Sequence, residues 1–584
     1  MWSRVSRFSE VSNADLAAAA AWLIAAIALY HRLPYGVSHG DEAFYNAMPY
    51  SFAIGNRPYF DELAIHQNAG VLLVPFYRIY LAIAGSADGI ILFNRYLYFV
   101  LAGFSSWLTY RVVKRVERGS TGCWAAALVL TFSYFNIFSL SYNTQGAFCF
   151  LCGTLCAASA LLDARPGRML FVASLFLVSG VFSYPGLVVV FVPYTGLVLA
   201  WLLRKAPASA RQSGLRGLGA GAVLALAVAV PLVIGIGKDN FRRLIAFQQS
   251  LGYLTQSALH RFDFYHSGAW AWRWSLLVFA AFFAAWPYLY SLPKRHVWLL
   301  ALASIAALWG CYRQCLTTPS ASGAMLFLLA LPILTPVCIA LNRDWRHGPF
   351  VLQLIWAPSV LSMMATTYTS SNGYAATSLG ALGVLVSGAA SFGAYLEALA
   401  EKNAGQRWGY EVGLAAFLAT CLAIQVDSLY GGAYDVDSVL ANLTTRVHAG
   451  PFRGTITDHN EAVFAEAIDR DLKQIATDSG TLLVFDNFPT GYLSTRLRPR
   501  TWCTWIDWMV DPAYLREAMA ENFGRPEQLP DFLLEVHMSD IARSFWAPYA
   551  QDYRVIVDRS DLDYRILRRV RARKKAKHPN RNRD

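Results

Sequence analysis

The chain has 584 residues, of which 55% are hydrophobic and only 15% are charged, and its mean hydropathy lies above zero. This composition excludes a soluble domain of that length and indicates a membrane protein. The net charge of +12 does not indicate a nucleic-acid partner, because ten Lys or Arg and a single Asp are gathered in residues 565–584. We expect that segment to be a basic, disordered tail that touches anionic lipid headgroups.

Fourteen apolar segments follow one another along the chain, and most have the length of about 17 to 25 residues that crosses a bilayer as a helix. The first has no clear small-residue cleavage site, so it predicts a retained helix and not a signal peptide. The segments lie at 14–33, 68–86, 89–110, 121–140, 144–162, 168–182, 185–203, 217–237, 271–292, 297–311, 323–341, 349–367, 378–398 and 409–427.

Lys and Arg are concentrated in every second loop between these segments, as the positive-inside rule predicts for cytoplasmic loops. The basic loops follow residue 110 and lie near 165, at 204–216, at 294–295 and at 343–346. Alternation places the stretch 35–70 and everything after 428 outside the cytoplasm. The amino terminus, with Arg4 and Arg7, is expected in the cytoplasm, so the number of membrane crossings must be odd and one of the fourteen segments should not span. Segment 68–86, which Pro75 and Arg78 interrupt, is the one expected not to span. The predicted fold of residues 1–428 is an all-α polytopic domain with about 13 transmembrane helices.

Residues 429–564 change in character and predict a small extracytoplasmic α/β domain. Its first helix opens with Asp458 three residues before Glu461, a capping-box-like start, and runs to Gly480. Strands are predicted at 481–486, 532–536 and 553–557, and the alternation of helix and strand favours a parallel sheet. Asp486 ends the first strand, where such sheets often bind ligands; a turn that packs the domain onto the membrane part is an equally good interpretation.

Two acidic pairs, Asp41-Glu42 and Asp61-Glu62, occupy the first polar break of the chain. A carboxylate at the membrane surface suits a general base that takes a proton from an acceptor hydroxyl during glycosyl transfer. That reaction also needs a group to stabilise the leaving phosphate, such as Arg, Lys, His or a metal. No nucleotide sugars are expected on the outer face, so the donor would be a lipid-linked sugar. A solvated acidic surface is the alternative interpretation of either pair alone.

The stretch "HGDEAFYNAMPYSFAIGNRPYFDELAIHQNAGVLL" resembles the first extracytoplasmic loop of the protein O-mannosyltransferase and aminoarabinose-transferase group. These are polyprenyl-phosphate-sugar-dependent glycosyltransferases of the GT-C superfamily. In that group an Asp-Glu pair follows the first transmembrane helix, and a second acidic residue lies about twenty positions on. The resemblance implies that Asp41 is the catalytic base and that its neighbour Glu42 orients the base or the sugar.

The same resemblance implies a donor-binding set after the catalytic pair. Asp61 or Glu62 would support the donor sugar, and the pair His66-Gln67 matches the donor-phosphate contact. Arg95, in "LFNRYLYF", falls where the family has an Arg at the start of a following helix. Residues 34–67 would then form a catalytic first outer loop.

Other polar groups admit two interpretations each. Arg313 in "CYRQC" is a second cation that would face a phosphate, or a snorkelling Arg. The segment 238–270, with His260, Arg261, Asp263 and His266, predicts a mobile cover over the site or a plain amphipathic surface helix. Three cysteines with zinc-like spacing lie inside an apolar segment with no His nearby, which favours helix packing: Cys149, Cys152 and Cys156.

The predicted activity is that of an integral membrane glycosyltransferase of the cell membrane that inverts the sugar's anomeric carbon and uses no metal or other cofactor. The donor would be a polyprenyl-phosphate-linked hexose or pentose, and the acceptor a lipid, a glycan or a protein. A transporter or flippase of a lipid-linked glycan is the alternative. It is disfavoured because the charges gather at the outer end of the helices and no internal repeat is found. A partner-binding assembly protein would leave the acidic stretch unexplained.

Overall fold

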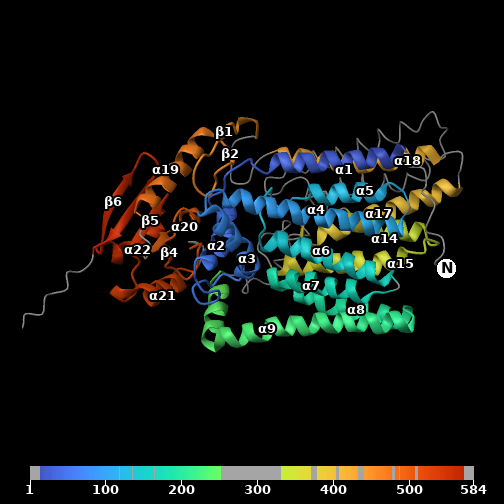
Figure 1. Cartoon of the computed structure of the whole chain (residues 1–584), viewed down its shortest axis with the longest axis horizontal. Helices are drawn as coiled ribbons and strands as arrows, with labels where there is room; N and C mark the ends of the chain where they lie inside the picture. The colour runs from blue at the N-terminus through green and yellow to red at the C-terminus, as the bar shows by residue number, and fades with distance from the viewer. Residues whose placement is uncertain are drawn as a thin grey trace, which may run out of the picture.

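The computed structural model describes residues 13–117, 119–133, 136–163, 165–251, 331–369, 378–402, 407–431, 440–475, 480–485, 487–506 and 511–570. Figure 1 shows a bundle of long helices with an α/β domain at one end. The prediction of an all-α membrane domain followed by a small α/β domain is therefore confirmed.

The helices of the bundle are long, apolar and mostly continuous. Within the described ranges, seven are long and apolar enough to cross a membrane. The bundle consists of α1 (Asn13–Arg32), α4 (Ile90–Val116), α5 (Thr121–Thr131), α6 (Tyr142–Leu161), α7 (Gly167–Ser183), η1 (Pro185–Leu187), α8 (Val188–Lys205), α9 (Ala208–Ser250), α14 (Leu331–Leu341), α15 (Gly348–Val351), the π-helical η3 (Leu352–Trp356), α16 (Ala357–Thr369), α17 (Ser378–Lys402) and α18 (Arg407–Tyr430).

Burial divides these helices into central and peripheral ones. α6 and α17 are almost wholly buried, whereas α1 and α9 expose most of their apolar side chains. Apolar surface of this extent is stable in contact with lipid and not with water, so α1 and α9 lie at the lipid-facing rim. The predicted segments 271–292 and 297–311 lie outside the described residues.

α9 continues beyond the predicted end of its segment at residue 237. Gly237 has a φ of 71°, a left-handed conformation that glycine adopts at little cost, and it bends the helix there. Residues 238–250 then form a short helical arm, which fits the surface-helix interpretation of that part of 238–270. His260, Arg261, Asp263 and His266 lie outside the described residues.

The predicted catalytic loop contains a helix that is buried inside the protein. α2 (Asp41–Ala53) has eleven of its thirteen residues buried. It packs against α3 (Gln67–Ala84), α4 and α20 (Thr490–Leu493), because its large apolar side chains are distributed around the whole helix. The sequence suggests that this segment has one apolar face that lies in the membrane interface, and the burial of α2 on all sides corrects that expectation.

α3 does not run away from the α/β domain, since both of its ends contact that domain. Just before it, the Leu63 amide donates to the Trp502 carbonyl over 2.8 Å. After its last turn, Arg496 donates to the Gly85 carbonyl, and the Asp88 carboxylate pairs with Lys473 at 2.6 Å. That segment 68–86 does not span the membrane stays a prediction.

The α/β domain contains a mixed five-stranded sheet and a two-stranded one. The larger sheet has the order β4 (Arg498–Pro499), β3 (Thr481–Phe485), β5 (Phe532–Val536), β7 (Tyr564–Arg569), β6 (Tyr553–Arg559). The smaller sheet pairs β1 (Thr445–Arg446) with β2 (Ile456–Thr457). The helical elements are η6 (Leu440–Asn442), α19 (His459–Ile475), α20, α21 (Pro512–Phe523), η7 (Pro526–Gln528) and α22 (Asp540–Ala550).

The three predicted strands form, but the sheet is not fully parallel. β3 runs parallel to β4 and β5, whereas β5, β7 and β6 are antiparallel neighbours. The difference comes from β7, which occupies residues assigned to the basic tail and closes a hairpin with β6. Apolar Ile566 and Leu567 are buried between the arginines, so the strand extends to Arg569. The predicted helix start is confirmed, since the Glu461 amide donates to Asp458 Oδ1 over 3.0 Å.

The segment before α2 is tied directly to the α/β domain. The Ile456 amide donates to the Pro34 carbonyl over 2.7 Å, and the Gly36 amide donates to the Ile456 carbonyl over 2.9 Å. Residues 34–36 therefore extend the edge of β2 as a short parallel partner. This pairing fixes where the chain enters α2 and so places Asp41.

Candidate functional site

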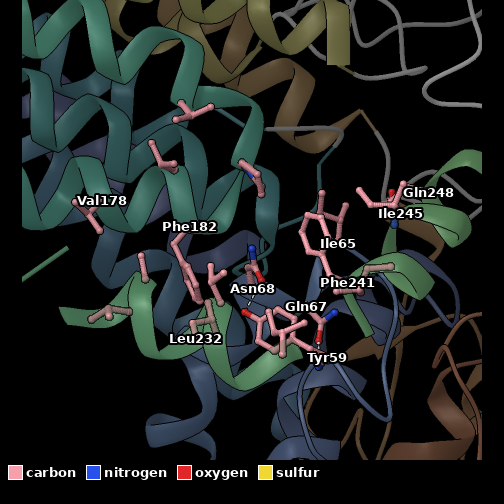
Figure 2. Close-up of a pocket in the computed structure, with 18 of the residues that line it drawn as sticks. Tyr59, Ile65, Gln67, Asn68, Val178, Phe182, Leu232, Phe241, Ile245 and Gln248 are labelled. Atoms are coloured by element: carbon pink, nitrogen blue, oxygen red, sulfur yellow. Dashed lines mark hydrogen bonds between the residues drawn. The ribbon is translucent and has the colours of Figure 1, made fainter. Parts of the chain in front are cut away.

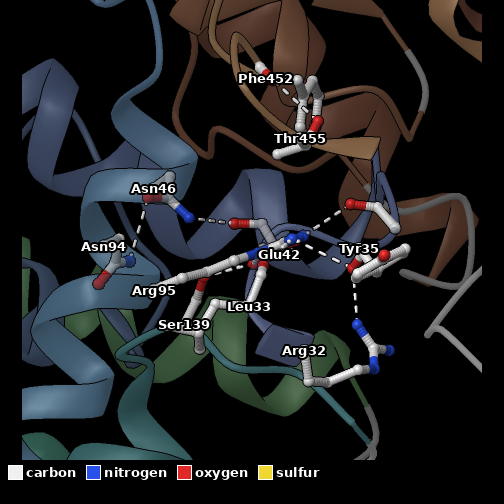
Figure 3. Close-up of polar contacts among 11 residues, drawn as sticks. Arg32, Leu33, Tyr35, Glu42, Asn46, Asn94, Arg95, Ser139, Phe452 and Thr455 are labelled. Atoms are coloured by element: carbon white, nitrogen blue, oxygen red, sulfur yellow. Dashed lines mark hydrogen bonds and ion pairs between the residues drawn. The ribbon is translucent and has the colours of Figure 1, made fainter. Parts of the chain in front are cut away.

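Glu42 is held inside the protein by Arg95, as Figure 3 shows. The Arg95 guanidinium donates to both carboxylate oxygens of Glu42, over 2.8 and 2.5 Å, and Ser139 adds a third donor. The remaining N–H groups of Arg95 donate to the backbone carbonyls of residues 33, 35 and 36. Both side chains are almost fully buried. The pair therefore anchors the entry to α2, which differs from the predicted roles of orienting a substrate and binding a donor.

A buried amide network continues from Glu42 into the bundle. Asn46 donates to the Glu42 carbonyl over 2.7 Å and accepts from Asn94 over 3.0 Å and from the Tyr77 hydroxyl. Asn94 in turn accepts from the Leu140 amide over 3.1 Å. These bonds fix α2 against α3 and α4, since each buried polar group finds a partner.

Glu62 and Gln67 are also occupied by protein partners. The Glu62 carboxylate accepts from the Ala64 amide over 3.0 Å and from the amide and hydroxyl of Thr504, both over 2.8 Å. Burial raises the pKa of Glu62, and these hydrogen bonds oppose that shift. Gln67 accepts from the Tyr59 amide over 2.6 Å and donates to the Glu62 carbonyl over 3.0 Å. Gln67 thus holds the first loop together, and Glu62 joins that loop to the α/β domain.

The two aspartates of the acidic pairs are more accessible than their glutamate neighbours. Asp61 is half-exposed and accepts from the Arg57 amide over 2.8 Å. Asp41 is the first residue of α2 and retains exposed surface. A carboxylate in the first turn of a helix is favoured in its ionised form by the helix dipole. In each pair the glutamate is therefore structural and the aspartate faces outward.

Asp41 belongs to an aromatic cluster that the sequence did not reveal. The Tyr45 hydroxyl donates to Asp41 Oδ1 over 3.2 Å. The ring of Tyr45 lies 5.7 Å from that of Tyr142, at the start of α6, and the two are edge to face. Tyr45 follows Asp41 by one helical turn, and this spacing was the available signal. Tyr142 is the first residue of α6 and lies in the polar stretch "SYNTQG", of which Ser141 is the N-cap.

His66 returns the chain to this same cluster. Its ring stacks on Tyr142 with centroids 3.9 Å apart and meets the edge of Phe44 at 6.3 Å. The residue keeps some exposed surface, but burial of the ring lowers the pKa of His66 to about 4. At neutral pH it is thus an uncharged imidazole with one nitrogen that can donate a hydrogen bond and one that can accept. α2 and the turn after it have brought His66 beside the first turn of α2, where Asp41 lies.

An apolar cavity of about 420 Å³ opens next to this turn. Figure 2 shows Gln67 and Asn68 among the residues that line it, between Phe182 and Leu232 on one side and Phe241 on the other. It is bounded by α7, η1, α8, α9 and the 59–68 segment, and apolar side chains supply most of its lining.

Glycines explain how this cavity arises between α7 and α9. Near the start of both helices they are in backbone contact, and a Cβ on Gly217 would lie 2.1 Å from the Gly167 carbonyl oxygen. Farther along, where Val178 and Phe182 face Ala225–Leu232, the larger side chains hold the helices apart and the cavity begins.

The polar groups of the cavity are neutral. Asn68 accepts from the Tyr59 hydroxyl over 2.7 Å, and Gln248 comes from the arm of α9. The described residues that line the cavity include no Lys or Arg. Arg313, predicted to face a phosphate, lies outside the described residues, as does Asp486.

The cysteines with zinc-like spacing lie in the interior of α6. Cys149, Cys152 and Cys156 are buried, and the Cys152 thiol is 3.1 Å from the Ser105 hydroxyl of α4. This contact agrees with helix packing. Within the described ranges, no three His, Cys, Asp or Glu side chains are grouped as a metal site would require.

No protein-family model matches the chain, and no curated protein matches it. Solved structures with a similar overall chain path include the following two. One is the archaeal oligosaccharyltransferase AglB from Archaeoglobus fulgidus, in complex with an inhibitory peptide and a dolichol-phosphate. It is 12% identical with a TM-score of 0.41, over 89% of this chain and 69% of that one. The other is apo ArnT from Cupriavidus metallidurans, also 12% identical with a TM-score of 0.41, over 96% of this chain and 99% of that one.

Proposed function

We propose that this chain is an integral membrane glycosyltransferase that moves a sugar from a polyprenyl-phosphate donor to an acceptor hydroxyl on the extracytoplasmic face. Asp41 takes the proton of the acceptor hydroxyl while the hydroxyl oxygen attacks the anomeric carbon of the donor sugar. The bond from that carbon to the phosphate oxygen breaks, and polyprenyl phosphate leaves with the electron pair. A single in-line displacement inverts the anomeric configuration.

The observation that carries the proposal is the continuity between the apolar cavity and the cluster around Asp41. Ile65, Gln67 and Asn68 line the cavity, and His66, between them in the chain, stacks on Tyr142. Tyr142 contacts Tyr45, whose hydroxyl bonds to Asp41. A prenyl chain in the cavity would bring its phosphate to the 65–68 turn and its sugar toward Asp41.

The division of the acidic pairs supports Asp41 as the base. A general base must reach the proton that it removes and must be able to accept it. Glu42 is neutralised by Arg95, and Glu62 accepts three hydrogen bonds inside the protein. Asp41 accepts from Tyr45 and keeps exposed surface. Asp61 is the second outward carboxylate, and we assign it to the sugar of the donor.

The proposed phosphate contact relies on hydrogen bonds from neutral groups. His66 is uncharged at neutral pH, so it would donate an N–H bond to the phosphate instead of supplying a positive charge. The Asn68 amide is a second donor on the same turn. Arg313 remains the predicted cation for the remaining charge.

The placement of buried charges favours an enzyme over a transporter. Transporters carry ionisable residues near the middle of the membrane. In the described part of the helical domain, the buried Asp, Glu, Lys and Arg side chains are Arg32, Glu42, Glu62 and Arg95 near the α/β domain, and Glu117 at the far end of α4. Four of these five buried charges thus lie at the end of the bundle that holds the proposed site, and Glu117 lies at the opposite end.

The test uses purified protein in lipid with a panel of polyprenyl-phosphate hexoses and pentoses and candidate lipid, glycan and protein acceptors. The expected result is release of polyprenyl phosphate together with a product of inverted anomeric configuration. Movement of the intact donor across the bilayer without release would identify the transporter instead. Retention of configuration would exclude the single displacement.

A further inference from the structure

A second cavity, larger than the first, lies at the other end of the bundle. Its volume is about 950 Å³, and it is enclosed by the end of α6, the start of α7, the end of α8, the start of α9 and α15. Figure 1 shows the end of α8, the start of α9 and α15 on the side of the bundle away from the α/β domain. It shares no lining residue with the cavity beside His66.

Its deeper walls are apolar and held in place by aromatic contacts. Leu202 and Phe350 are buried, and the Trp201 ring meets Phe350 edge to face at 5.6 Å. The Trp201 indole donates to the Gln353 side chain over 2.9 Å. This bond joins α8 to η3 across the cavity, so the space between them is maintained by specific contacts.

Its charged groups are predominantly cationic. Arg204 and Arg346 both line the cavity and are exposed, and in the described part of the chain neither has a carboxylate partner. The one carboxylate of the lining, Asp163, pairs with Arg115 at 3.1 Å. His347 adds a ring nitrogen, and burial together with neighbouring Arg346 lowers the pKa of His347, which leaves it neutral at pH 7. Two guanidinium groups are therefore available to an anion.

We propose that this cavity binds the phosphate headgroup of an anionic membrane lipid, with Arg204 and Arg346 on the phosphate and the acyl chains against the apolar wall. Arginine pairs with phosphate through two parallel hydrogen bonds. Basic pockets between transmembrane helices at the cytoplasmic surface suit such headgroups. The loops at this end are the basic ones, and by the positive-inside rule they face the leaflet that carries anionic lipids.

A lipid is favoured over a free phosphate ion by the apolar share of the lining. Leu161, Leu197 and Trp201 are partly exposed and offer an apolar surface that inorganic phosphate cannot use. Acyl chains would bury that surface, so the lipid should bind where the ion alone does not.

The test compares full-length protein with the variant Arg204→Gln/Arg346→Gln in nanodiscs, and measures retained phosphatidylglycerol by native mass spectrometry and by displacement of a fluorescent analogue. The control, Arg211→Gln/Arg343→Gln, removes two exposed charges from the same end outside the cavity lining. We expect the cavity variant to bind phosphatidylglycerol about tenfold or more weakly and the control to bind normally.

Two further arms separate the sources of the phosphate. Phosphatidylcholine should not compete, and inorganic phosphate should displace the lipid only poorly. Equal weakening in both variants would reduce the effect to general surface charge and overturn the proposal. Displacement by inorganic phosphate at the affinity of the lipid would show an ion site, and equal retention of phosphatidylcholine would show no headgroup selection; either result would also overturn it.

Discussion

Arg95 donates to both carboxylate oxygens of Glu42, over 2.8 and 2.5 Å. Glu42 directly follows Asp41 in the chain. Neighbouring acidic residues thus have separate roles: Glu42 fixes the first turn of α2, and Asp41, the first residue of that helix, keeps exposed surface. The segment before α2 pairs with β2, and Arg95 binds both this segment and Glu42. The ion pair therefore helps to set the position of Asp41 relative to the α/β domain.

Breaking this ion pair should destabilise the protein. Glu42→Ala leaves the Arg95 guanidinium buried without its counter-charge, which typically costs about 3 to 5 kcal/mol. The double variant Glu42→Ala/Arg95→Met removes both charges and should recover much of that loss. Denaturant unfolding in detergent measures both. A double variant no more stable than Glu42→Ala would show that the charge is not the cause.

The folded state should lose stability in acid through His66. Burial lowers its pKa from 6.5 to about 4. As the pH falls between these values, the unfolded chain takes up a proton and the folded chain does not, so stability is complete above pH 6.5 and declines toward pH 4. The residue keeps some exposed surface, so we expect a loss of about 2 kcal/mol. His66→Phe keeps the stack on Tyr142 and should reduce this loss in unfolding measured across that pH range.

The same pair of proteins tests the donor contact. His66→Phe lacks the N–H group, so it should weaken donor binding with little change in turnover at saturating donor. His66→Gln, which retains an N–H donor, should recover part of the affinity. An unchanged donor KM in His66→Phe would place the phosphate elsewhere.

Activity should survive excess chelator. Glu42 is paired with Arg95 and Glu62 is bound by Thr504, so neither carboxylate is available to complete a cation site with its aspartate. Turnover is measured before and after treatment with EDTA. Loss of activity that magnesium or manganese restores would make Asp41 and Asp61 candidate ligands and contradict the proposed roles.

The membrane topology can be tested with single cysteines introduced at exposed positions of a variant that lacks the native cysteines. Arg165→Cys, Ser209→Cys and Arg343→Cys should react with an impermeant thiol reagent only from the cytoplasm, and His448→Cys only from outside. Labelling of Ser209→Cys from outside would reverse the orientation and place the proposed site on the wrong face.

The sequence predicted those parts of the fold that depend on local pattern. Apolar segments of membrane length and the strands at 481–485 and 532–536 have signals within their own residues. β7 had no such signal, because arginines flank its apolar pair Ile566-Leu567 and the excess of positive charge dominates the composition. The antiparallel pairing of β7 depends on contacts with β5, which no local pattern reports.

The sequence was sufficient to predict which segment holds the candidate site, but not how the side chains of that segment are arranged in space. The acidic pairs marked 35–70, but which carboxylates face outward depends on Arg95 and Thr504, which lie 53 and 442 residues away from their partners. Likewise, His66 meets Tyr142 only because α2 turns the chain back on itself. Spacing in the sequence carries no record of such contacts, so the burial of Glu42, Glu62 and Gln67 emerged from the structure.

The most direct test is the turnover of Asp41→Asn with saturating donor, with Asp61→Asn as the matched control at the other outward carboxylate. Asparagine has nearly the same shape and can still accept from Tyr45, so folding and donor binding should be preserved. Loss of a general base removes about two to four orders of magnitude in rate, and we expect that loss in Asp41→Asn but a weaker effect, mainly on donor KM, in Asp61→Asn. Wild-type turnover in Asp41→Asn would contradict the assignment of Asp41 as the base.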